Sequence, residues 1–289
     1  MSNLTFTLGG HTFVVSHNEG VAPTLLPPAY TPFATSPAGP IAASYEVVTD
    51  LPSHDGDKRV VWKTETWRLL ERPDGRWTLA IHVLPDEHPV PVACIERDFS
   101  GAALLPIAGR HGAASPHAMN YPCDQIVVMN RLLKLGALVV HASAVSFDGT
   151  GLLFCGRSGA GKTTLARIAR SKGAVLLNDD RQILHDVNGT ISVSPTPWHG
   201  LDPEVNAVTA PLRAIFHLVQ APATKLTPIH GATAAARLMA TAIAPFYLET
   251  GMQDAINAIE RITTRVPSYI LEFTPDADTV RLCRGVARP

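Results

Sequence analysis

The spacing of hydrophobic and polar positions changes near residue 120. Before that point, short apolar runs occupy residues 5–8, 12–16, 59–67, 76–83 and 90–95. Runs of this length, with apolar and polar residues interleaved, predict strands. The turn sequences SHDGD and RPDGR separate several of them. We therefore expect a small β-rich N-terminal region over residues 1–120.

Within this region, residues 21–40 read VAPTLLPPAYTPFATSPAGP. Proline lacks a backbone N–H and clashes with the preceding helical turn, so this stretch cannot form a regular α-helix. An ordered surface loop is expected there.

From residue 121 onward, helical and strand patterns intermingle. A helix is predicted over 124–136, with Asp124 as its cap and as the start of the second region. Strand patterns follow at 137–147, 151–155, 174–184, 190–195, 210–220 and 268–273, and helical patterns at 163–173, 232–249, 252–265 and 276–283. Asp148-Gly149 and Asn188-Gly189 are hairpin turn signals. The fold class predicted for residues 121–289 is α/β.

Composition narrows the class of protein. The 24 Lys and Arg residues nearly balance the 25 Asp and Glu residues, and no basic run favours a nucleic-acid partner. The four cysteines lack C-x-x-C spacing, which argues against a zinc site or a disulfide framework and suits a reducing cytosol: Cys94, Cys123, Cys155 and Cys283. There is no signal-peptide pattern and no 18-residue apolar stretch. We expect a soluble, cytoplasmic protein with no membrane partner.

The sequence GRSGAGKTT, residues 156–164, carries the clearest chemistry. It fits G-x-x-x-x-G-K-[ST] between a short apolar run and a helical pattern. In such a phosphate loop, glycines let backbone N–H groups approach a polyphosphate, and the helix N-terminus favours negative charge. The simpler alternative is a glycine-rich turn that only joins strand to helix. The predicted nucleotide-binding residues are Gly156, Arg157, Ser158, Gly159, Ala160, Gly161, Lys162, Thr163 and Thr164, with Thr163 also a Mg²⁺ ligand.

Four segments together resemble the HPr kinase and PEP-carboxykinase-like proteins. They are HASAV from His141, the phosphate loop 15 residues later, NDD at 178–180 and PTPWHG at 195–200. More narrowly, they look like HPr-kinase-related proteins of peptide-modification gene clusters, including the kinases of lasso-peptide pathways. The resemblance covers residues 137–220, more loosely to 273. It implies a P-loop kinase domain with a mixed sheet over 121–289, behind the β-rich region.

The resemblance implies a catalytic base at Asp179 and a metal- or phosphate-organising carboxylate at Asp180. Phosphoryl transfer to an alcohol indeed needs Mg²⁺ and a carboxylate that accepts or orients the hydroxyl proton. Neighbouring strand residues point to opposite faces, so both acids can serve one site only if the strand end bends. Which of the two is base and which is ligand stays open at this point. The alternative is an acidic turn without catalytic function.

Other polar residues near these motifs are weaker candidates. The resemblance places His141 near the phosphates and the metal, although a lone strand histidine is more often structural. Arg181 either stabilises transition-state charge or merely neutralises the aspartates. Trp198 and His199 either form an acceptor-side lip or belong to a loop anchored by a buried tryptophan. Ser143 receives no role.

These residues predict an ATP- and Mg²⁺-dependent kinase that acts on a hydroxyl, with a Ser or Thr of a peptide or small protein as acceptor. In that prediction Lys162 holds the phosphates and Asp179 is the base. The RGLG-like signature of HPr kinases is absent, so HPr is not the expected substrate. The alternatives are a nucleotide-binding regulatory subunit and a kinase for a small hydroxyl metabolite. Because HPr-kinase relatives are often oligomeric, the resemblance also implies that this protein can form a homo-oligomer.

Overall fold

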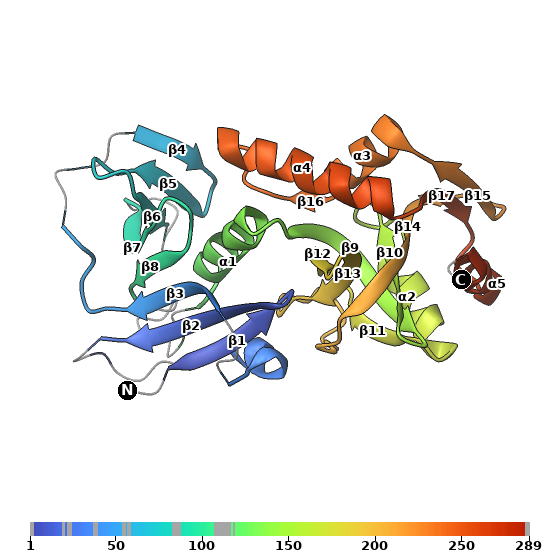
Figure 1. Cartoon of the computed structure of the whole chain (residues 1–289), viewed down its shortest axis with the longest axis horizontal. Coiled ribbons are helices and arrows are strands. Elements are labelled where there is room, and N and C mark those ends of the chain that lie inside the picture. Colours follow the sequence, from blue (N-terminus) through green and yellow to red (C-terminus); the bar gives the residue numbers. More distant parts are fainter. Residues whose placement is uncertain are drawn as a thin grey trace. The chain divides into compact units, whose positions relative to one another are not determined.

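The computed structural model describes residues 3–18, 21, 25–36, 40–53, 56, 59–82, 88–106, 117 and 119–286. The chain divides into two compact units (Figure 1). The first consists of Met1–Thr7, His11–Lys134 and Pro245–Gly251, and the second of Leu8–Gly10, Leu135–Ala244 and Met252–Pro289. The boundary between the two units therefore lies after Lys134, whereas the sequence pattern suggests a boundary after residue 120.

The first unit is built on an eight-stranded mixed sheet of order β1-β2-β3-β8-β7-β6-β5-β4. β3 pairs in parallel with β2 and β8, and the β4 to β8 neighbours pair antiparallel. Its strands are β1 (Leu4–Leu8), β2 (His11–His17), β3 (Ile41–Val47), β4 (Arg59–Lys63), β5 (Trp67–Glu71), β6 (Trp77–Ile81), β7 (Val90–Ile95) and β8 (Gly101–Leu104).

The sequence pattern suggests that helix α1 (Cys123–Lys134) opens the second unit. In the structure this helix belongs to the first unit. Asp124 lies inside its first turn and accepts a hydrogen bond from the Tyr30 hydroxyl at 3.1 Å. Tyr30 is part of a 3-10 helix, Pro28–Phe33, within the proline-rich stretch, which forms no α-helix among its described residues. A tertiary contact thus fixes the position of Asp124.

One strand expected in this unit is in fact two. The pattern at 59–67 stops at Lys63, and β5 begins at Trp67. The Thr64 hydroxyl accepts hydrogen bonds from the backbone N–H groups of Thr66 and Trp67, which closes a tight turn. A Thr hydroxyl that bonds its own backbone favours turns over strand continuation. Residue 83, at the end of another predicted strand, lies outside the described residues.

The second unit holds a nine-stranded sheet. Its main order is β10-β9-β12-β13-β14-β17-β15, and β11 and β16 both pair with β9. β10 also pairs in parallel with β14, so five strands close into a ring. The strands are β9 (Leu138–Phe147), β10 (Thr150–Cys155), β11 (Val175–Asn178), β12 (Arg181–Val187), β13 (Thr190–Pro195), β14 (Ala210–Gln220), β15 (Lys225–Ile229), β16 (Ala242–Ile243) and β17 (Ser268–Phe273).

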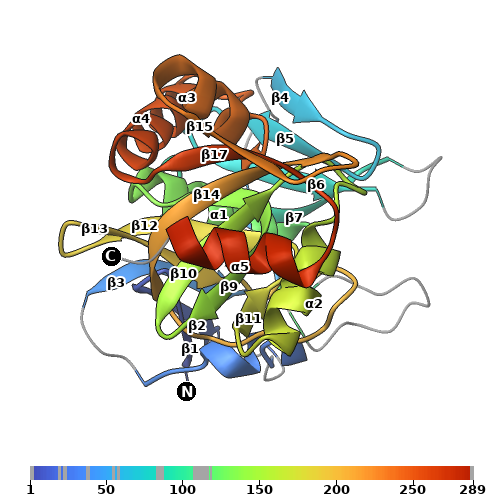
Figure 2. The same ribbon diagram turned by 90° about the vertical axis from the view of Figure 1, so that its right-hand side faces the viewer.

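Four helices complete this unit: α2 (Lys162–Ser171), α3 (Gly231–Met239), α4 (Glu249–Arg265) and α5 (Ala277–Val286). α2 and α5 pack together on one face of the strands, and α3 and α4 lie on the other side (Figures 1 and 2). Phe154, Phe216 and Phe273 belong to the buried core on the α2 side. Because strand side chains alternate between faces, His217 points away from that core.

The predicted strand, loop and helix follow in order at residues 150–171. The glycine-rich loop, residues 156–161, joins β10 to α2. Gly159 and Gly161 have φ of +78° and +98°, which disfavours any other residue. A Cβ on Gly156 would lie 2.8 Å from that of Ala160. The loop therefore needs glycine at these positions for its own geometry.

Other expectations for this unit are partly confirmed. Both hairpin turns are present, with positive φ at Asp148, Gly149, Asn188 and Gly189. The strand expected at 174–184 is broken at residues 179–180, and the helix expected at 232–249 ends at Met239. β15 has no counterpart in the sequence prediction. Among the described residues, no helix is long and apolar enough to cross a membrane.

Candidate functional site

Lys162, the first residue of α2, is buried against the glycine-rich loop. Its ammonium group donates to the carbonyl oxygens of Gly156 at 2.9 Å and Arg157 at 3.1 Å. Burial lowers the pKa of Lys162, against the opposite effect of the charges on Asp180 and Asp179. A cation is thereby fixed beside the N-terminal end of a helix, where the free N–H groups already favour an anion.

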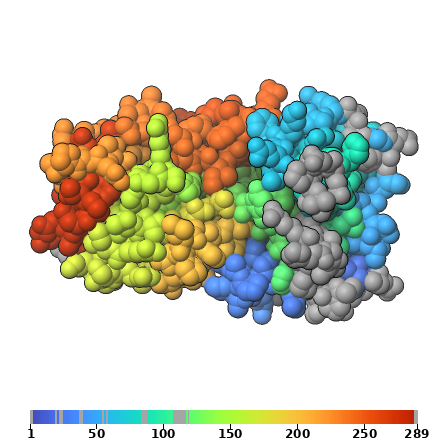
Figure 3. All heavy atoms as spheres, turned by 180° about the vertical axis from the view of Figure 1, so that it is seen from behind, coloured from blue at the N-terminus to red at the C-terminus, as the bar shows by residue number. Residues whose placement is uncertain are grey.

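Asp179 connects α2 to the segment after β13. Its side chain is buried, and its two oxygens accept the backbone N–H groups of Gly200 at 2.9 Å and Asp202 at 3.0 Å. The Thr163 hydroxyl lies 3.5 Å from Oδ2. In Figure 3 the yellow-green atoms of α2 adjoin the gold atoms of this segment. Asp179 thus holds the segment against the start of the helix.

Asp180 is more accessible, with 20% of its side chain exposed, and it faces His141 and Arg181. Its Oδ1 lies 2.9 Å from Nδ1 of His141, and its Oδ2 lies 3.5 Å from Nε of Arg181. Burial alone would raise the pKa of Asp180, but the His141 hydrogen bond and nearby positive charges hold that pKa below its ordinary value. His141 and Arg181 are neighbours because they pair across β9 and β12.

Asn178 keeps the chain bent between the two aspartates and β12. Its buried amide donates to the carbonyl oxygens of Thr196 at 2.8 Å and Trp198 at 3.2 Å. Its side-chain oxygen, Oδ1, accepts a hydrogen bond from the backbone N–H of Asp180 at 2.8 Å. The bend allows both carboxylates to serve one site. Sequence reasoning gave Asn178 no role, although a polar residue that ends an apolar strand was the available signal.

Replacing Asn178 by alanine is expected to destabilise the protein by about 3 kcal/mol, because several buried backbone groups lose their partners. The melting temperature should then fall by roughly 6–12 °C. Thermal unfolding followed by circular dichroism measures this change. Asn257→Ala, at an exposed position of α4, is the matched control. Equal melting temperatures for the two variants would contradict the role of Asn178.

The remaining sequence candidates lie at the edge of this cluster. The Ser143 hydroxyl donates to the Asp179 carbonyl at 2.8 Å, and the Trp198 side chain is buried. His199 is exposed, with Nδ1 3.2 Å from the Gly200 carbonyl oxygen. Leu201, which sequence reasoning missed, is 87% exposed directly after Gly200. An exposed leucine beside two carboxylates offers an apolar contact at the mouth of the site.

A cavity of about 360 Å³, which we name the carboxylate cavity, brings most of these groups together. Of the sequence candidates it is lined by His141, Ser158, Gly159, Gly161, Lys162, Thr163, Thr164, Asp179 and Asp180. Arg181, Trp198 and His199 are not among its lining residues. Gln220, Phe273 and Pro275 also line it, and sequence reasoning had no signal for them. Gln220 donates to the Gly159 carbonyl at 2.9 Å and so ties β14 to the loop.

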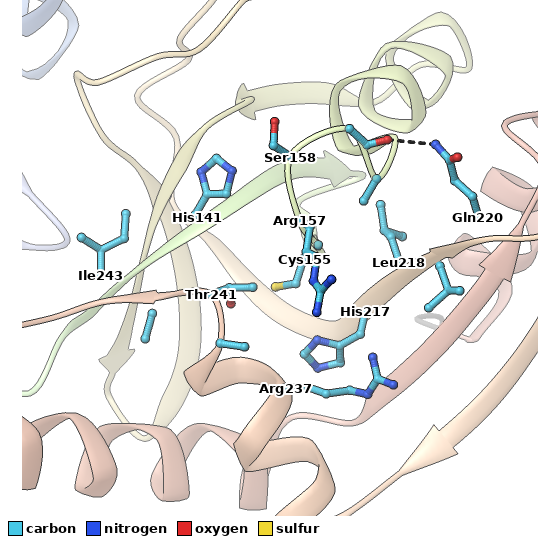
Figure 4. Close-up of a pocket in the computed structure, with 16 residues that line it drawn as sticks. His141, Cys155, Arg157, Ser158, His217, Leu218, Gln220, Arg237, Thr241 and Ile243 are labelled. Carbon is cyan, nitrogen blue, oxygen red and sulfur yellow. Dashed lines mark hydrogen bonds between the residues drawn. The ribbon is translucent and has the colours of Figure 1, made fainter. Parts of the chain in front are cut away.

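A second cavity, of about 710 Å³, opens on the glycine-rich loop and is shown in Figure 4. We name it the His217 cavity. It is lined by loop residues 156–160, by the end of β14 and by Arg237 of α3. His217 is only 4% exposed, and burial, aided by the charge of Arg237, lowers its pKa to about 4. The imidazole is therefore neutral near pH 7.

This shift predicts a pH dependence of stability. The unfolded chain binds a proton at the ordinary pKa of 6.5, whereas folded His217 does so only near 4. Stability is therefore lost as the pH falls through this window, by roughly 2 kcal/mol between pH 7 and 5. Urea unfolding of the wild type and His217→Gln at both pH values measures it. The difference in the free energy of unfolding between the two proteins should change by that amount between the two pH values. An unchanged difference would refute the lowered pKa of His217.

Comparison with known proteins places the chain in a family. Residues 117–276, more than half of the chain, match the family described as SynChlorMet cassette protein ScmC. The chain belongs to the ScmC family. The matched range contains the glycine-rich loop, the bend at the two aspartates and both cavities.

Further comparisons are more distant. No curated protein matches the chain. The solved structure of the Hpr(Ser) kinase/phosphatase from Coxiella burnetii is similar over 52% of this chain and 88% of that chain, with 16% identity and a TM-score of 0.32. At these values the relationship of this ScmC-family chain to HPr kinases is distant at most.

Proposed function

We propose that the chain is an ATP- and Mg²⁺-dependent kinase that phosphorylates a hydroxyl group, namely a Ser or Thr of a peptide or small protein. One observation carries this proposal. The carboxylate cavity combines the N-terminal end of α2, Lys162, the Thr163 hydroxyl and two carboxylates. Phosphoryl transfer requires groups that can hold a polyphosphate and carboxylates for the metal and the acceptor hydroxyl, and side chains of both kinds line this one cavity.

The phosphates of ATP would lie on the glycine-rich loop. Backbone N–H groups at the start of α2 have no partner within the helix, and the open backbone of the loop lets an anion approach. The Lys162 ammonium already lies at the rim of the loop through its two carbonyl contacts. It would neutralise charge on the transferred phosphoryl group, which is the main task of the protein in this reaction.

The donor set fits Mg²⁺. This ion takes oxygen ligands and is usually held by one or two carboxylates together with substrate phosphates. The Thr163 hydroxyl and the Asp179 carboxylate lie 3.5 Å apart and supply such oxygens. No group of three or more acidic, histidine or cysteine ligands occurs among the described residues, so this site would rely on the nucleotide for its remaining ligands. When bound, Mg²⁺ supplies charge neutralisation between the phosphates.

The contacts favour an exchange of the roles that the resemblance implies for the two aspartates. Both oxygens of Asp179 are engaged by backbone N–H groups, whereas Asp180 is more exposed and reaches the same cavity. In our proposal Asp180 accepts the proton of the attacking hydroxyl. The hydroxyl oxygen forms a bond to the terminal phosphorus, and ADP leaves. His141 and Arg181 keep Asp180 ionised and oriented.

On the acceptor side, the segment after β13 brings Leu201 to the mouth of the carboxylate cavity. An exposed apolar side chain there suits a peptide segment more than a small polar metabolite. The family description names a cassette, so the other proteins of such a cassette are the first acceptors to examine. We place the kinase in the cytoplasm, as a possible homo-oligomer, with neither nucleic acid nor membrane as a partner.

The test is incubation with Mg²⁺ and γ-labelled ATP against a Ser-containing peptide panel, free serine, HPr and no acceptor. Transfer to a peptide by the wild type, and not by Asp180→Asn, is the expected result. Transfer to free serine alone would favour a metabolite kinase. A shift of the melting temperature by ATP without any transfer to the panel or to co-encoded proteins would favour a regulatory subunit and contradict the kinase proposal.

A further inference from the structure

The His217 cavity carries positive charge without a compensating acid. Arg157 and Arg237 both line it, and no aspartate or glutamate does. Neither guanidinium has an acidic partner within the described part of the chain. In the view of Figure 4, Arg157 extends from the loop toward His217, and Arg237 lies on the other side of that histidine. Guanidinium groups without a carboxylate partner in a concave site favour an oxyanion ligand.

His217 supplies an independent indication. It is 4% exposed, and its Nε2 atom is buried without a hydrogen-bond partner. Buried polar atoms are nearly always paired, so an unpartnered one on a residue that lines a cavity suggests a ligand atom beside it. A neutral imidazole can carry its proton on Nε2 and donate it to an anion. Its position next to Arg237 would place two donors on the same ligand group.

The cavity also lies within reach of the proposed chemistry. It shares His141, Ser158, Gly159 and Gln220 with the carboxylate cavity, so the two open on the same loop. Residues 156–160, the first half of the loop, line the His217 cavity, whereas Lys162, Thr163 and Thr164 line only the other. Since Lys162, Thr163 and Thr164 line only the carboxylate cavity, the transferred phosphoryl group would lie there, and the His217 cavity would adjoin it across the first half of the loop.

We propose that the His217 cavity is an oxyanion subsite in which Arg237 and the Nε2–H of His217 bind a carboxylate or phosphate group carried by the acceptor. The statement that the acceptor carries this group rests on the proposed kinase function. The statement that the cavity binds an oxyanion does not depend on that function. The same chemistry could come from a second source, the nucleotide phosphates, and the test separates the two.

The experiment follows the imidazole ¹⁵N resonances of the full-length protein at pH 7.5. Acetate and inorganic phosphate are the probes, each titrated with and without saturating MgADP, whose binding is measured separately by calorimetry. The His217 signal is assigned by its loss in His217→Gln. We expect a saturable change of this signal with both probes, also when MgADP is present. Binding should be at least tenfold weaker in Arg237→Gln and unchanged in Arg281→Gln, an exposed α5 position.

Several results would overturn this subsite. One is a His217 signal that responds to neither probe, and another is an equal response in Arg237→Gln. A response to MgADP alone that blocks both probes would assign the anion to the nucleotide and overturn its assignment to the acceptor. If Arg237→Gln does not fold, Arg237→Lys replaces it in the test. This variant keeps the charge but loses the bidentate guanidinium, so it must still bind acetate and phosphate more weakly than the wild type. Absence of MgADP binding would count against the kinase proposal while the His217 response still decides the subsite.

Discussion

Replacing Lys162 by methionine is expected to lower phosphoryl transfer about 1,000-fold or more. Methionine retains an apolar stem of similar length, so packing at the start of α2 is kept. The lost ammonium is the cation that would stabilise charge on the transferred phosphoryl group, and one such interaction contributes on the order of 100- to 1,000-fold or more. Single-turnover transfer from γ-labelled ATP measures the effect.

The matched control is Lys172→Met, which removes the same charge just beyond the C-terminal end of α2, at an exposed position. It should transfer phosphate like the wild type. Transfer by Lys162→Met within tenfold of the wild type, at saturating ATP, would mean that the loop does not hold the reacting phosphates. The kinase proposal would then lose its main support.

Asp180→Asn is expected to lower transfer by roughly 100- to 10,000-fold, the usual contribution of a general base. Its contact with His141 is partly exposed, so the free energy of unfolding should fall by less than about 1 kcal/mol. Asp179→Asn should instead cost about 3 kcal/mol. Its new NH₂ group would face a backbone N–H of Gly200 or Asp202, and buried donors would lose their acceptor.

The dependence on Mg²⁺ separates the two roles further. With Asp179 as the ligand beside Thr163, the Mg²⁺ concentration for half-maximal transfer should rise in Asp179→Asn and stay unchanged in Asp180→Asn. Unfolding in urea and transfer at varied Mg²⁺ are measured on the same preparations. A raised Mg²⁺ requirement in Asp180→Asn alone would restore the roles that the sequence resemblance implies.

Local signals in the sequence explain why much of the second unit was predictable. Asp148-Gly149 and Asn188-Gly189 specify tight hairpins by themselves, because these residues tolerate the positive φ that such turns need. The glycine-rich loop is similar, since its glycines, its lysine and the flanking strand and helix are contiguous. Its membership of a nucleotide site still remains a prediction.

Elements that depend on distant partners were harder to predict. The helical pattern at 232–249 gave no signal that residues 242–243 would pair with β9, and the pattern at 174–184 did not show the break that Asn178 stabilises. The short strand β15 forms against β17, a contact that its own sequence does not encode. In each case the energy of a tertiary contact exceeds the weak local preference.

The sequence by itself determined the glycine-rich loop, the adjacent aspartates and the α/β class, because contiguous residues encode each of them. Only the tertiary structure distinguished the two aspartates. It placed the N–H groups of Gly200 and Asp202 on Asp179, and His141 and Arg181 on Asp180. It also brought His217 and Arg237 into one cavity from β14 and α3. Strand pairing and helix packing set such juxtapositions, which sequence spacing does not encode.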